Sequence, residues 1–192
     1  MLNNALQFII QSLFNLFIMA FLLRFYLQLM RAPYRNPFSQ FIGALTNFAV
    51  FPVRRVIPGL WGLDLASLSI AWLLQLAMLL LLLWLGDFPL TVAGAGAFGG
   101  IVLWSLAKLL SLSLYLLMGA VIVQALLSWV NPYTPLAPLL ASLTEPFLRP
   151  ARQLIPLISG IDLSPLVVLF IIQLLLILPV AWLEQMAYRM IF

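Results

Sequence analysis

The chain has 192 residues, of which 65% are hydrophobic and only 7% are charged, far below the roughly 25% of charged residues in ordinary soluble domains. This composition is typical of an integral membrane protein. The chain contains no cysteine and no histidine, which excludes disulfides, thiolate nucleophiles, most zinc sites and His-based catalysis. The net charge of +4 comes from nine basic residues spread along the chain, so we interpret it as a topology signal and expect no nucleic-acid partner.

Four apolar segments are long enough to span a bilayer, which takes about 20 residues. They cover approximately residues 5–29, 65–85, 103–130 and 163–182. The first segment lacks the basic region and the cleavage site of a signal peptide, so it is predicted to remain as a span. The connectors 31–64 and 131–162 hold six of the nine basic residues, which predicts that both connectors are cytoplasmic and both termini periplasmic.

The sequence repeats itself at a spacing of 98 residues. The positions that coincide include Pro52 with Pro150, Arg54 with Arg152, Asp64 with Asp162 and Gln75 with Gln173. Each copy consists of a span, a cytoplasmic segment and a second span, so the two hairpins are predicted to be parallel and related by an axis along the membrane normal. We predict a single all-α membrane domain, in which residues 1–86 form the first hairpin, 87–100 a Gly-rich periplasmic connector and 101–192 the second hairpin.

Each cytoplasmic connector contains a predicted amphipathic helix. Apolar residues recur at helical spacing over 37–48 and again over 135–145. Both segments are too short to span, so we expect each helix to lie in the cytoplasmic interface of the membrane. Prolines are predicted to end the two helices, at Pro52 in the first copy and at Pro146 and Pro150 in the second.

The stretch "LTEPFLRPARQLIPLISGIDLSPLVVLFIIQ", residues 143–173, resembles the signature of the YggT family of bacterial integral membrane proteins, which has relatives in plastids. The first copy is a degenerate version of it, with Asn47 in place of Glu145 and Ser67 in place of Pro165. The resemblance covers nearly the whole chain. It implies a bacterial inner-membrane location and a role in envelope processes such as osmotic tolerance, cell division or assembly of membrane complexes, and it implies no catalytic residues.

Charged residues near the prolines form the predicted functional surface, which consists of Arg54, Asp64, Glu145, Arg149, Arg152 and Asp162. In one interpretation the arginines bind anionic headgroups of the bilayer, at about 1 kcal/mol each. In the other, Arg54 and Arg152 pair with the two aspartates or form a site at the repeat interface. The aspartates directly precede apolar runs and are predicted helix N-caps. Because the second copy keeps the fuller motif, we expect Asp162 to matter more than Asp64.

Polar residues inside the spans follow helical stripes. Gln75 and Gln173 each lie 11 residues after an aspartate, close to the bilayer midplane. Two further stripes consist of Gln7, Gln11 and Asn15 on the first span and of Ser105, Lys108, Ser111 and Tyr115 on the third. These residues either bond neighbouring helices, at about 0.6 kcal/mol per hydrogen bond, or line a polar pathway. Lys108 is expected to snorkel toward the outer interface.

The sequence favours a non-enzymatic protein with no cofactor and no metal site. We expect a scaffold or assembly factor that binds a membrane-protein partner or a second copy of itself through the cytoplasmic surface. The alternative is a small channel or transporter for an ion or an osmolyte. That alternative is weakened because no acidic residue is predicted to lie deep in a span, where it could carry a proton or bind a cation.

Overall fold

The computed structural model describes residues 2–33, 35–59, 62–89, 94–131, 133–154 and 162–192, and this part of the chain contains helices and no strand. Four helical segments are long and apolar enough to cross a membrane, namely Asn3–Leu29, Leu65–Leu85, Ala95–Val130 and Ser164–Ile191. The all-α fold class and the four predicted spans are confirmed. The chain is a multi-pass integral membrane protein.

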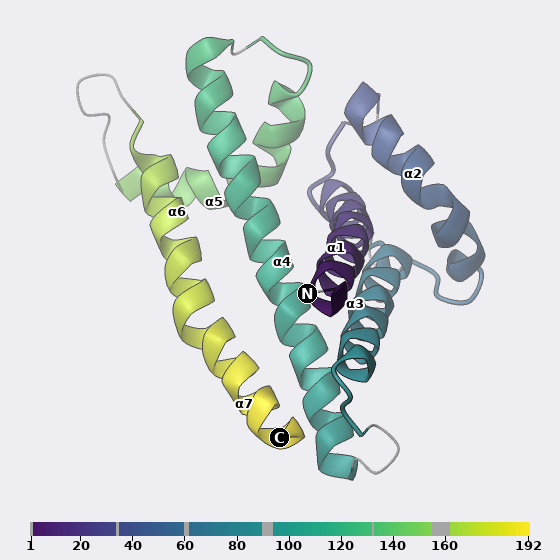
Figure 1. Cartoon of the computed structure of the whole chain (residues 1–192). Coiled ribbons are helices and arrows are strands. Elements are labelled where there is room, and N and C mark those ends of the chain that lie inside the picture. The colour runs from purple at the N-terminus through teal and green to yellow at the C-terminus, as the bar shows by residue number, and fades with distance from the viewer. Residues whose placement is uncertain (1, 34, 60–61, 90–93, 132, 155–161) are drawn as a thin grey trace.

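The spans pack as two neighbouring pairs. Helix α1 (Leu2–Leu29) packs on α3 (Leu65–Leu85), whereas α4 (Ala95–Val130) packs on the composite last span, made of α6 (Ser164–Leu175), a π-helical turn η1 (Leu176–Val180) and α7 (Ala181–Ile191). Helix α4 also contacts α3 and α1, and so it joins the two pairs (Figure 1). The relation of the two repeats by an axis along the membrane normal stays a prediction.

The largest buried cluster lies where α1, α3 and α4 meet the first connector helix, α2 (Pro37–Arg54). Its fully buried side chains include Ile18, Leu22 and Val50. A second cluster forms in the other repeat between α4, α6 and the second connector helix, α5 (Ala137–Leu154). Each connector helix is thus packed against the spans of its own repeat, and α2 and α5 lie toward the end of the bundle opposite the turn between α3 and α4 (Figure 1).

The two connector helices continue through their prolines, so the prediction that Pro52, Pro146 and Pro150 end them is wrong. A proline inside a helix removes one amide donor and crowds the carbonyl four residues earlier. Here the helical turns around the prolines are anchored by burial of Val50 in α2 and Leu148 in α5, which offsets that cost. The interfacial position of the two helices remains a prediction.

The face of α2 that meets the protein carries small and polar residues. Ser39, Gly43 and Thr46 are buried, while Phe41 and Phe48 are exposed at 60% and 70%. Phenylalanines that point away from the bundle are expected where a helix borders lipid or another protein.

The Gly-rich segment that was predicted as a connector up to residue 100 is helical from Ala95 onward. Gly100 in this segment is needed for helix packing, because α4 approaches α7 closely there. A Cβ atom there would lie 2.8 Å from Ile191 Cγ1 and 2.9 Å from the carbonyl oxygen of Ala187. Helix α4 therefore begins within the predicted connector 87–100, and at Gly100 only a residue without a side chain fits against α7.

The last span extends beyond its predicted end at Trp182 to Ile191. It passes through the π-helical turn η1, which contains Pro179. A proline lacks the amide donor of a regular helical turn, and a widened turn relieves its clash with the preceding carbonyl. The polar residues that follow, including Glu184, consequently belong to a helix packed on α4.

Candidate functional site

An arginine-aspartate pair joins the end of α2 to the start of α3 in the first repeat. Arg54 donates from Nη2 to Oδ2 of Asp64 at 2.7 Å and from Nε to Oδ1 at 3.3 Å. The Asp64 side chain is fully buried, and it also caps α3 by accepting hydrogen bonds from the amide and the hydroxyl of Ser67. Both predicted roles of Asp64, the cap and the arginine partner, are confirmed.

A second arginine, Arg24 of α1, shares the same carboxylate. Its Nε lies 3.3 Å from Asp64 Oδ2, and its Nη1 donates to Thr46 at 2.7 Å and to Asn47 at 2.8 Å. The site in the first repeat therefore gathers residues from α1, α2 and the start of α3. Two guanidinium groups around one buried carboxylate satisfy its oxygens and hold the three elements in register.

The second repeat builds the equivalent pair with a different third member. Arg152 donates from Nε to Asp162 at 2.8 Å and from Nη1 to Glu145 at 3.0 Å. Asp162 accepts the amide hydrogen of Ser164 at 2.9 Å, but Leu163 occupies the N-cap position of α6, so the prediction that Asp162 is the N-cap is wrong by one residue. At the repeat spacing of 98 residues, Glu145 corresponds to Asn47, and Arg24 corresponds to an isoleucine. The third member of the site is thus a cation, Arg24, in the first repeat and an anion, Glu145, in the second.

The two pairs differ in burial. The side chain of Asp64 has no exposed surface, whereas those of Asp162 and Glu145 are 31% and 47% exposed. Burial alone would raise the pKa of Asp64, but hydrogen bonds from Arg54 and Ser67 outweigh it and hold the pKa below its ordinary value. The pKa of Asp162 is lowered in the same way, with burial opposed by hydrogen bonds from Ser164 and Arg152.

Five of the six predicted surface residues fall into two clusters, and Arg149 belongs to neither. Arg54 and Asp64 belong to the first cluster, and Glu145, Arg152 and Asp162 to the second. Among the described residues no hydrogen bond or ion pair connects the two clusters, so the pairing lies within each repeat. Arg149 is exposed and takes part in no ion pair with a described residue.

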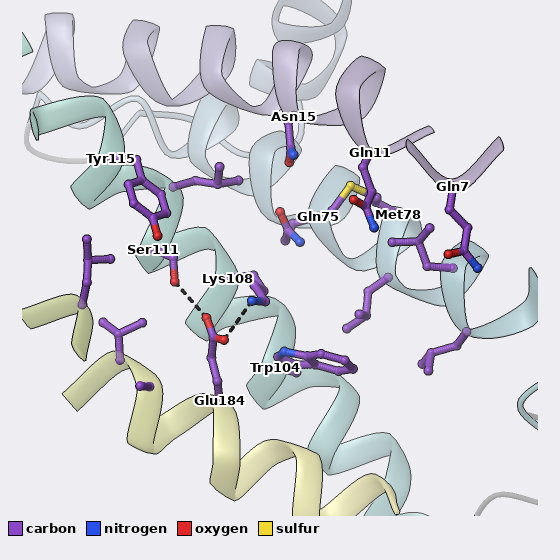
Figure 2. A pocket seen from close by; sticks show the side chains of 17 residues that line it. Gln7, Gln11, Asn15, Gln75, Met78, Trp104, Lys108, Ser111, Tyr115 and Glu184 are labelled. Atoms are coloured by element: carbon purple, nitrogen blue, oxygen red, sulfur yellow. Dashed lines mark hydrogen bonds and ion pairs between the residues drawn. The ribbon is translucent and has the colours of Figure 1, made fainter. Parts of the chain in front are cut away.

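A half-open cavity of about 610 Å³ lies between α1 and α3 on one side and α4 and the last span on the other, and apolar side chains make up much of its lining. The polar stripe of α1 and most of the stripe of α4 face it, as the sequence periodicity indicated. Its polar and aromatic lining consists of Gln7, Gln11, Asn15, Gln75, Trp104, Lys108, Ser111, Tyr115 and Glu184 (Figure 2).

An ion pair lies on one wall of this cavity. Lys108 of α4 donates to Glu184 of α7 at 2.8 Å, and the Ser111 hydroxyl donates to the other oxygen of Glu184 at 3.0 Å (Figure 2). A partner in the neighbouring helix satisfies the charge of Lys108, and its predicted snorkelling toward the outer interface stays a prediction. Glu184 belongs to the fourth helical segment, Ser164–Ile191, and lies just beyond the span predicted over residues 163–182.

The amide side chains of the other wall lack such partners. Gln75 is 1% exposed, and its Oε1 and the buried Oδ1 of Asn15 accept no hydrogen bond within the described part of the chain. Gln173, the repeat counterpart of Gln75, is exposed on the outside of α6 and does not line this cavity. The two glutamines therefore occupy different environments despite their equal distance from an aspartate.

Comparison with known sequences decides the family. The CCB3/YggT family model matches residues 3–85 and again residues 103–183. This chain belongs to the CCB3/YggT family. It is 41% identical to an uncharacterised protein of Pseudomonas aeruginosa over 170 residues, covering 86% of this chain and 83% of that protein. It is 34% identical to the uncharacterised protein YggT of Escherichia coli K12, covering 88% and 86%. No solved structure matches it.

The double match of the CCB3/YggT model supports the tandem arrangement, since the second match ends 98 residues after the first. The relatives provide no residue roles, so the site rests on geometry. Arg24 and Glu184 were not among the predicted site residues of this family member. The signal for Arg24 was a charge within an apolar span, and the signal for Glu184 was a charge two residues beyond the expected end of a span at Trp182. No group of three or more potential metal ligands occurs among the described residues.

Proposed function

We propose that this protein is a non-enzymatic scaffold or assembly factor of the bacterial inner membrane. Both termini lie in the periplasm, and a partner membrane protein docks on the cytoplasmic surface around α2 and α5. The feature that carries the proposal is the arginine-aspartate pair at the end of each connector helix. Each pair fixes the connector helix to the following span, so the exposed residues of that helix are presented in one orientation. Precise orientation is of use to a docking surface and of little use to a simple loop.

The exposed residues of the connector helices fit a membrane-associated partner. Phe41 and Phe48 on α2 offer aromatic groups, which are enriched in protein interfaces. Arg149 on α5 offers an exposed positive charge, which can bind an acidic group of a partner or an anionic headgroup. A homo-oligomer can use the same surface, and the partner is identified by the experiment below.

Site-specific photocrosslinking in living cells tests this proposal. A photoreactive amino acid at Arg149 is expected to yield a discrete crosslinked product, whereas the same residue at Phe98, exposed at the start of α4, is expected to yield none. Arg149→Glu should remove co-purification of the crosslinked partner at normal membrane abundance. Arg189→Glu, the same charge change in the last turn of α7, serves as the matched control.

The opposite result favours the alternative function. If position 149 gives no crosslink, Arg149→Glu is silent, and the purified protein alone passes an ion or osmolyte in liposomes, the scaffold is excluded and a channel or transporter takes its place. The half-open cavity with its Lys108–Glu184 pair is the feature that such a function would use.

A further inference from the structure

We propose that the cavity between α1, α3, α4 and α7 is a binding site for a small neutral molecule that carries several hydroxyl groups. This inference concerns the interior of the bundle and does not rest on the scaffold function. It is argued from three properties of the cavity, namely its unpaired acceptors, its balanced charge and its mixed lining.

The first property is a pair of buried acceptors without donors. Oε1 of Gln75 and Oδ1 of Asn15 are buried at the cavity wall and accept no hydrogen bond from a described residue. Figure 2 shows both side chains directed toward the same space. A buried carbonyl oxygen that stays unpaired is costly, and most such oxygens in proteins have a partner. A leucine at position 75 would avoid that cost, so the amide indicates a ligand that supplies donors.

The second property is the balance of charge. Lys108 and Glu184 are the charged residues of the lining, and they form an ion pair at 2.8 Å. Ser111 donates a further hydrogen bond to the glutamate. The pair leaves no net charge to compensate a bound ion, and an uncompensated ion in a membrane interior is expensive. A neutral ligand is therefore favoured over a cation or an anion.

The third property is the combination of amide, hydroxyl and aromatic groups. A hydroxyl group both donates and accepts, so a polyol can donate to Gln75 and Asn15 and accept from an amide group elsewhere on the wall. Trp104 and Tyr115 add aromatic surface, against which the carbon backbone of a polyol can pack. The volume of about 610 Å³ is within the range of ligand pockets, roughly 300 to 1,000 Å³, and exceeds what a single water molecule fills.

Hydroxyl groups in a membrane come from two sources, a free solute or the headgroup of a neutral lipid. Binding of radiolabelled xylitol to purified protein in lipid-free detergent micelles tests the shared chemistry. Saturable binding of xylitol would show that the site accepts a molecule with several hydroxyl groups. Competition by added monoacylglycerol, a neutral lipid whose headgroup keeps more than one free hydroxyl group, assigns the natural ligand to a lipid headgroup, whereas a lack of such competition assigns it to a free solute.

Two variants test the location of the site. Gln75→Leu is expected to weaken xylitol binding about tenfold or more, because it removes a hydrogen bond made only with ligand. Gln173→Leu makes the identical change at the corresponding position of the other repeat, outside the cavity, and should bind as the parent does. Asn15→Leu provides a second variant in the cavity, should Gln75→Leu fail to fold.

Three results would overturn the inference. The first is the absence of saturable xylitol binding, which would mean that the cavity holds only water. The second is equal xylitol binding by Gln75→Leu, Asn15→Leu and the parent. The third is competition by tetramethylammonium or acetate at concentrations similar to that of unlabelled xylitol, since a site with balanced charge should discriminate against both ions.

Discussion

Arg54 donates to both carboxylate oxygens of Asp64, from Nη2 at 2.7 Å and from Nε at 3.3 Å, and thereby connects the last turn of α2 to the N-cap of α3. The two residues are ten positions apart, and the same spacing separates Arg152 from Asp162. The repeated pair is the principal device that fixes each connector helix relative to the span that follows it. Asp64 is fully buried and Asp162 is partly exposed, so the two pairs should contribute differently to the free energy of unfolding.

Asp64→Asn should destabilise the protein more than Asp162→Asn, which reverses the order expected from the fuller motif of the second copy. Neutralising Asp64, whose side chain is fully buried, leaves Arg24 and Arg54 without their carboxylate, and because these arginines are 14% and 37% exposed the cost should be limited to about 2 kcal/mol. Asp162 is partly exposed, so its loss should cost about 1 kcal/mol, as for an ion pair near the surface with one backbone hydrogen bond. Unfolding by SDS titration in mixed micelles measures both, and a larger loss for Asp162→Asn would contradict the assignment.

Stability should depend on pH through the same carboxylate. The pKa of Asp64 is lower in the folded state than its ordinary value of 3.8, so the unfolded chain binds the proton more readily. The stabilisation is therefore complete above about pH 5 and is lost as the pH falls through the lowered folded pKa. Unfolding free energies between pH 3 and pH 7, in roughly half-unit steps, should decline at the acidic end. Asp64→Asn should flatten this decline, and an unchanged profile in the variant would argue against it.

Gln75→Leu should stabilise the ligand-free protein by about 1 to 3 kcal/mol, because it replaces a buried unpaired amide by an apolar group of similar size. Gln173→Leu alters an exposed residue and should change stability by no more than about 0.5 kcal/mol. The same unfolding assay compares them. Loss of stability in Gln75→Leu would show that the amide has a partner within the protein.

Gly100→Ala should weaken the packing of α4 on α7 by about 1 to 3 kcal/mol, because its Cβ would lie within 2.9 Å of both Ala187 and Met190. Gly96→Ala is the matched control in the same helix. No atom lies within 4 Å of its added Cβ, so it should gain up to about 1 kcal/mol from helix propensity. Equal effects of the two substitutions would mean that α7 does not approach α4 as described.

The proposed orientation predicts the accessibility of single cysteines, which can be introduced cleanly because the chain has none. In intact spheroplasts, an impermeant thiol reagent should label Gly94→Cys, at the start of α4, and spare Gln153→Cys, near the end of α5. Both positions are exposed in the folded protein. Labelling with the opposite preference would place both termini in the cytoplasm.

The membrane class, the four spans, the tandem repeat and the capping role of Asp64 could be predicted from the sequence, which left the arginine partner of Asp64 open between two interpretations. These properties depend on composition, on segment length and on spacing along one chain, which local rules describe. The sequence did not reveal that α2 and α5 continue through their prolines or that α4 begins within the predicted connector 87–100. The packing that offsets the cost of Pro52 and requires Gly100 comes from residues far away in the sequence.

Only the tertiary structure decided which side chains meet. Periodicity shows that Gln75 and Gln173 lie on equivalent faces of equivalent helices, yet one is buried at a cavity and the other is exposed. Helix α3 contacts both α1 and α4, whereas α6 has α4 as its single neighbour among the other spans in the described part of the chain. In the same way, Arg24 reaches Asp64 across 40 residues and Lys108 reaches Glu184 across 76. A helical repeat fixes the face on which a residue lies, but the packing of helices determines what that face contacts.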